Sequence, residues 1–149
     1  MPTIGLRAAI VLTSTVAMVG CGRSPITPVR IENAVEPTFA NLVQLQVSWL
    51  GLPAMAVSDF GVTASCRKLA GGKVGAGEWV CNLAWLGPDR QSLRNTYDLF
   101  VTTDGCYTAT VEGTDLGRPT LKTPDGRDVR NLLFTFEGCF DRTTRFFNN

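Results

Sequence analysis

The sequence contains no histidine. A chain without imidazole has no Ser-His or Cys-His nucleophile, no imidazole metal ligand, and no side chain whose unperturbed pKa lies near neutrality. It also has no C-x-x-C pair and no G-x-S-x-G motif, so a zinc site and a hydrolase nucleophile of the common kinds are not indicated. We expect no metal and no cofactor. An enzyme built on this chain would have to use carboxylates, lysine or tyrosine.

The chain also has little net charge. Fourteen basic and thirteen acidic side chains leave a formal charge of +1, and the basic ones are scattered along the sequence. Nucleic-acid binding requires a basic patch, so we expect no nucleic-acid partner. With 149 residues and 44% apolar residues, the chain has room for one domain and an N-terminal appendage. We expect a monomer.

Long hydrophobic segments are missing too. The uncharged apolar run AAIVLTSTVAMVG at residues 8–20 has thirteen residues. As a helix it would span roughly 20 Å, which is short of the ~30 Å hydrocarbon core of a bilayer. This run, preceded by Arg7, is therefore typical of a signal peptide rather than of a permanent membrane span.

Met18, Val19, Gly20 and Cys21 end this run. Together they resemble the lipobox of bacterial lipoproteins. The resemblance implies that residues 1–20 are removed as a signal peptide and that Cys21 is the lipid attachment site, with a diacylglyceryl group on its sulfur and a fatty acid such as palmitate on its new amine. Lipid chains would then hold the protein at the extracytoplasmic face of a membrane. The alternatives are an ordinary signal peptide with Cys21 as a free thiol, or an N-terminal core helix.

Residues 21–36 contain two prolines and no helical apolar stripe, which predicts a flexible tether. Residues 37–149 form the predicted domain. Its first segment has apolar residues at intervals of three and four from Phe39 to Leu50, Pro37 at a suitable first-turn position, and Gly51 at the end. This pattern predicts one amphipathic helix that begins near residue 37.

The rest of the domain reads as β-structure. Short runs rich in β-branched and aromatic residues end at glycine, aspartate or proline. They predict antiparallel strands near residues 61–68, 78–86, 97–103, 106–112 and 132–140. The fold class is therefore α+β, with one helix packed on a four- to five-stranded antiparallel sheet. In EWVCNLAW, alternation predicts that Trp79, Cys81, Leu83 and Trp85 face the core.

Two connections matter for the register and for binding. Asp104-Gly105 predicts a two-residue type I′ turn, which would place Val101 opposite Thr108, with a longer bulged loop as the alternative. Residues 113–131 have no usable periodicity and many turn-forming residues, so they predict a long loop of the kind that often carries binding residues.

Without Cys21, four cysteines are left, and an exported domain with four cysteines is expected to form two disulfides. Three pairings are possible. Cys66 and Cys81 lie at similar distances from the glycine-rich centre of a hairpin, while Cys106 begins one strand and Cys139 lies near the end of another. Geometry therefore favours Cys66–Cys81 and Cys106–Cys139.

Carboxylates are the remaining catalytic candidates. A glycosidase-like pair would need two of them about 5 to 9.5 Å apart in a cleft. The candidates are Glu137, Asp141, Asp115, Asp125 and Asp128. Turn chemistry for Asp125 and strand alternation for Glu137 favour solvent-facing residues over catalytic ones.

Two strings, YDLFVTTDGCYTAT at residues 97–110 and LLFTFEGCFD at residues 132–141, resemble segments of exported bacterial lipoproteins that have no established activity. The resemblance implies export and fold rather than a reaction. We therefore expect a lipid-anchored, non-catalytic binding or accessory module of the bacterial cell envelope, whose partner is an envelope protein or a glycan. The alternatives are an envelope hydrolase that uses a carboxylate pair, and a structural or inhibitory envelope protein.

Overall fold

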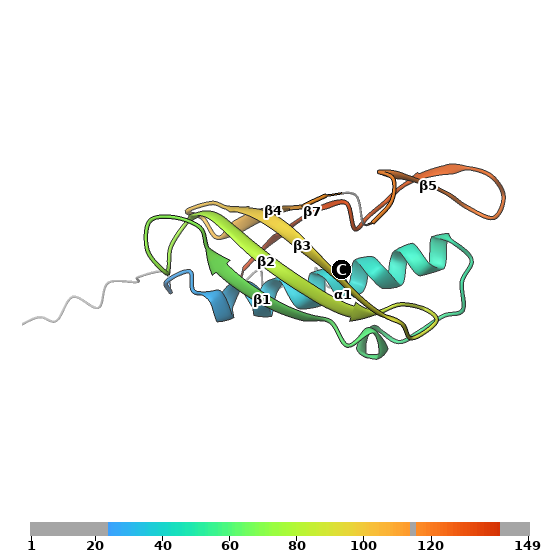
Figure 1. The fold of residues 1–149 in the computed structure, drawn as a ribbon, viewed down its shortest axis with the longest axis horizontal. Coiled ribbons are helices and arrows are strands. Elements are labelled where there is room, and N and C mark those ends of the chain that lie inside the picture. Colours follow the sequence, from blue (N-terminus) through green and yellow to red (C-terminus); the bar gives the residue numbers. More distant parts are fainter. Residues whose placement is uncertain (1–23, 114–115, 141–149) are drawn as a thin grey trace, which may run out of the picture.

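The computed structural model describes residues 24–113 and 116–140 of the chain. Within these residues, one long helix, α1 (Pro28–Trp49), packs on a five-stranded antiparallel sheet (Figure 1). The order of the strands is β1 (Thr63–Lys68), β2 (Gly77–Leu86), β3 (Ser92–Val101), β4 (Cys106–Val111), β7 (Thr135–Cys139). A 3-10 helix, η1 (Val57–Phe60), precedes β1. The predicted α+β class is confirmed.

The helix begins at Pro28, so the predicted tether is wrong for residues 28–36. Thr27 caps the helix, because its side-chain oxygen accepts a hydrogen bond from the backbone N–H of Arg30. Pro37 lies inside α1 rather than at its start. Ile31 and Val35 are fully buried members of the hydrophobic core, so the early turns of the helix belong to the packed domain. None of the described helices is long and apolar enough to cross a bilayer. Cys21 lies outside the described residues.

The core lies between α1 and one face of the sheet. Phe39 of α1 is fully buried, with its ring centroid 4.9 Å from that of Trp85 and 5.6 Å from that of Tyr97. The four alternating residues predicted for the core face of β2 are all buried, which confirms that prediction; they are Trp79, Cys81, Leu83 and Trp85.

The connection between β3 and β4 is longer than a type I′ turn. Val101 pairs with Tyr107, so the predicted pairing of Val101 with Thr108 is wrong and the bulged alternative is confirmed. The N–H of Thr102 donates to the carbonyl of Cys106 at 2.8 Å, which leaves three residues in the loop. Only Gly105, with φ +84°, has a left-handed conformation there. A type I′ turn needs two such residues.

Residues 113–131 are not a long irregular loop as predicted. They contain a two-stranded antiparallel ribbon of β5 (Thr120–Lys122) and β6 (Asp128–Arg130). Buried Asn131 anchors the ribbon, because its side-chain amide donates to the carbonyls of Leu116 and Arg118, at 3.1 Å each. The bounds of β3 and β7 also differ from expectation. β3 begins at Ser92 rather than at 97, and β7 covers only 135–139.

Both predicted disulfides are present. Cys66–Cys81 joins β1 to β2, and Cys106–Cys139 joins β4 to β7. Each links residues that lie directly opposite one another in the register, with Cα–Cα distances of 4.1 and 3.8 Å. The first lies in the core, and the second lies on the other face of the sheet. Together they fix both outer strands of the sheet to their neighbours.

Candidate functional site

The face of the sheet that points away from α1 is the candidate site, and we call it the open face. Side chains alternate along a strand, so the neighbours of every core residue point to this side. Most open-face residues are exposed, as the alternating burial of β2, β3 and β4 shows. The open face comprises Thr63, Ser65, Arg67, Glu78, Val80, Asn82, Ala84, Arg94, Thr96, Asp98, Phe100, Thr108, Thr110, Thr135 and Glu137, together with Cys106–Cys139.

The strand register places these side chains in rows that cross the sheet. One row runs from Glu78 to Phe100, Thr108 and Glu137, because each pairs with the next on the adjacent strand. Neighbouring strands are about 4.8 Å apart, so the row extends over roughly 14 Å. An aromatic ring therefore lies between a carboxylate and a hydroxyl group.

Phe100 is the most unusual residue of the open face. Its side chain is 59% exposed, although β3 lies inside the sheet with β2 and β4 on either side. It lines a hollow of about 410 Å³ whose other side chains include Leu69, Asp98 and Thr110. Exposed aromatic rings on rigid surfaces are common anchors in binding interfaces, because burying them on association releases a large apolar area.

A second and more polar hollow, of about 600 Å³, lies further along the same face. The Thr96 hydroxyl donates to the side-chain carbonyl of Asn82 at 2.9 Å across β2 and β3. Arg94 and Glu112 also line this hollow. The open face thus has an aromatic end and a polar, charged end, and it offers both hydrogen-bond donors and hydrogen-bond acceptors.

Three of the predicted catalytic carboxylates lie in the described part of the chain, one on the open face and two on the ribbon. Glu137 is exposed on the open face. Asp125 lies in the turn of the ribbon, where hydrogen bonds from the Thr123 hydroxyl and from Arg127 lower the pKa of its carboxyl group. Asp128 forms a salt bridge with Lys122 at 2.8 Å on the same ribbon. Asp115 and Asp141 lie outside the described residues. In the part of the chain that the structure describes, no group of three or more His, Cys, Asp or Glu side chains is placed to hold a metal ion.

Sequence reasoning missed Phe100 and its neighbours. The alternation of YDLFV does carry the signal, because Tyr97, Leu99 and Val101 face the core and leave Phe100 on the opposite side. Alternation alone therefore places this aromatic residue on the solvent side of the strand.

Comparisons of the chain with protein-family models, with curated proteins and with solved structures find no match. The fold and the open face define an α+β domain with two cross-strand disulfides, and its function is inferred from its own geometry.

Proposed function

We propose that the protein is a non-catalytic binding module of a bacterial cell envelope that uses the open face to hold an envelope protein or glycan. The exposed ring of Phe100, held between Glu78 and Thr108 on a rigid sheet, is the observation that supports this proposal most directly. A surface fixed by strand pairing loses little conformational entropy when it binds. Phe100 would supply apolar contact area, and the surrounding polar side chains would set orientation.

An extracytoplasmic location agrees with the disulfides. Disulfides form and persist in oxidising compartments, and two of them stabilise a domain of this size. In this proposal a lipid on Cys21 keeps the domain at the membrane surface. Cys21→Ala would then abolish acyl labelling of the protein and leave the uncleaved precursor. Unchanged labelling would end the lipoprotein hypothesis.

A native gel of detergent-solubilised envelopes tests the binding role. We expect the wild-type chain to migrate in a complex larger than the monomer. Phe100→Ala should release the monomer, because it removes the main apolar contact of the open face. Val29→Ala is the matched control, since Val29 is similarly exposed, at 62% against 59%, but lies on α1. A complex that survives Phe100→Ala, or that is lost equally in both variants, would contradict the proposal.

A further inference from the structure

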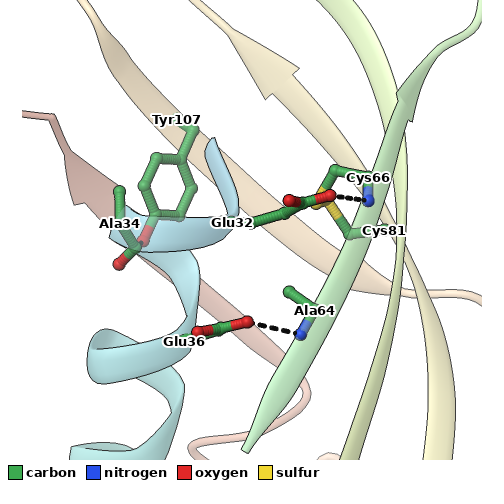
Figure 2. The surroundings of a disulfide bond; sticks show 7 residues. All are labelled: Glu32, Ala34, Glu36, Ala64, Cys66, Cys81 and Tyr107. Carbon is green, nitrogen blue, oxygen red and sulfur yellow. Dashed lines mark hydrogen bonds between the residues drawn. A yellow bond between two sulfur atoms is a disulfide. The ribbon is translucent and has the colours of Figure 1, made fainter. Parts of the chain in front are cut away.

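The two edges of the sheet differ in how their backbone groups are satisfied. At the β1 edge, the N–H of Ala64 donates to Glu36 and the N–H of Cys66 donates to Glu32, each at 2.8 Å (Figure 2). Both glutamates lie on α1, one turn apart. They occupy donors that an additional strand would need. The β1 edge is therefore closed to strand addition.

At the opposite edge, no side chain among the described residues accepts a hydrogen bond from the outward N–H groups of Glu137 and Cys139 on β7. The N–H of Val111 donates to Phe134 and the N–H of Phe140 donates to Gly105, which fixes the phase of the β4–β7 ladder. In an antiparallel ladder, residues alternate between bonded and non-bonded pairs. Glu137 and Cys139 are in non-bonded pairs with β4. Their backbone N–H and C=O groups therefore point away from β4, toward the outer edge of the sheet.

The outward backbone groups of Glu137 and Cys139 have no hydrogen-bond partner among the described residues. The carbonyl of Thr135, two residues before Glu137, accepts a hydrogen bond from Arg130 at 2.8 Å, so the part of the edge without partners begins after Thr135. Outside the β4–β7 ladder, no described residue bonds the backbone groups of Glu137 or Cys139. The Cys106–Cys139 disulfide holds this stretch against β4. The edge is thus a short, rigid template with two donors and two acceptors.

We propose that an extended segment of a protein partner adds to the outer edge of β7 as a sixth strand, with a lysine or arginine beside Glu137. This inference rests on the proposed binding role and names one partner chemistry for it. Strand addition uses main-chain hydrogen bonds for affinity and side-chain positions for specificity. The Glu137 carboxylate, exposed on the open face, selects a basic side chain on the added strand.

The same charge argues against a second copy of this chain as the partner. Two β7 strands paired around a two-fold axis at Glu137 would place two carboxylates directly opposite one another. Like charges in that position destabilise a strand pair. A basic segment of a different protein avoids this repulsion.

Peptide binding to the full chain in detergent tests the proposal. The probe is a fluorescent peptide of alternating valine and lysine, with two matched controls: a valine–glutamate peptide and a backbone N-methylated valine–lysine peptide. We expect the lysine peptide to bind at least tenfold more tightly than either control, and Glu137→Lys to reverse the charge preference. Equal binding of the N-methylated peptide would overturn the proposal, because that peptide cannot complete the ladder.

Hydrogen exchange locates the contact. The lysine peptide should slow exchange of the Glu137 and Cys139 amides and leave those of Ala64 and Cys66 unchanged. Protection of Glu137 and Cys139 without peptide would overturn the proposal. If that protection increases with protein concentration, a second copy occupies the edge; if it does not, the chain itself covers it. If the lysine peptide does not bind but the envelope complex that depends on Phe100 is still present, the strand addition at β7 is rejected and the binding role of the open face is not.

Discussion

Glu32 and Glu36 are predicted to stabilise the fold by capping the β1 edge. Both side chains extend from α1 to β1, and each accepts one backbone N–H at 2.8 Å (Figure 2). Replacing either glutamate with alanine removes the acceptor of that N–H, which then either bonds water or has no hydrogen-bond partner. The two variants therefore remove one defined hydrogen bond each, from Cys66 in Glu32→Ala and from Ala64 in Glu36→Ala.

The expected cost follows from the charge and the partial burial of the carboxylates. A hydrogen bond to a charged group contributes about 1.5 to 3 kcal/mol when buried. Glu32 and Glu36 are half-buried, and water replaces part of the lost interaction. We therefore expect each alanine variant to lower the free energy of unfolding by about 1 to 2 kcal/mol. For a domain of this size, that corresponds to a fall in Tm of about 4 to 8 °C.

Replacing Glu36 with glutamine separates the contribution of the hydrogen bond to stability from the contribution of the charge. Glu36→Gln keeps an acceptor oxygen but loses the charge assistance, and charge-assisted bonds are roughly twice as strong as neutral ones. We expect it to lose about half as much stability as Glu36→Ala. Asn33→Ala, an exposed change on the same helix, should shift the unfolding free energy by less than about 0.5 kcal/mol.

Amide hydrogen exchange gives the sharpest readout. Each 1.4 kcal/mol lost locally speeds exchange about tenfold. Glu32→Ala should accelerate exchange of the Cys66 amide more than that of the Ala64 amide. Glu36→Ala should accelerate exchange of the Ala64 amide more than that of the Cys66 amide. Equal acceleration of both amides in both variants, or none in either, would refute the capping role.

Three further predictions concern the core and the second disulfide. Gly138→Ala should cost about 1 to 3 kcal/mol, because a Cβ at Gly138 would lie 2.3 Å from the Tyr107 hydroxyl; an unchanged denaturant midpoint would show that the ring moves freely. Burial raises the pKa of both tyrosines, Tyr97 and Tyr107, so their contribution to stability is complete below the unfolded-state pKa of about 10 and falls as the pH rises above it. Ultraviolet absorbance should show tyrosinate forming together with unfolding, and free titration of the folded protein near pH 10 would contradict their burial. Replacing Cys106 and Cys139 together with serine should cost about 4 kcal/mol for a separation of 33 residues, measured by urea unfolding; a change below about 1 kcal/mol would reject that estimate.

Several strands of the five-stranded sheet and the Cys66–Cys81 disulfide could be predicted because their signals are local. Alternation in EWVCNLAW separates core from solvent residues within β2. The similar distances of Cys66 and Cys81 from a glycine-rich turn indicated that they face each other, and the register confirms it.

The helix start could not be predicted in this way. Ile31 and Val35 continue the apolar stripe of α1, but Pro37 resembles a first-turn residue and hides the earlier turns. Glu32 and Glu36 looked like residues of a polar tether. Their partners are the amides of β1, about 30 residues away in the sequence, and no local pattern indicates such a contact.

The ribbon and the open face depend on long-range contacts as well. β5 and β6 have three residues each, which is too short for a periodic signal, and Asn131 holds them through carbonyls more than ten residues earlier. The row that contains Phe100 exists only because the registers of neighbouring strands align Glu78 and Thr108 beside it. A one-residue change in either register would separate these side chains.

Site-specific photocrosslinking in the native envelope tests the binding role of the open face most directly. A photoreactive amino acid at Thr108, beside Phe100, should give one discrete adduct, and the same probe at Asn33 on the exposed side of α1 should not. The Thr108 adduct should disappear in the Phe100→Ala background. No adduct from Thr108, or the same adducts from both positions, would contradict the assignment of the open face as the binding surface.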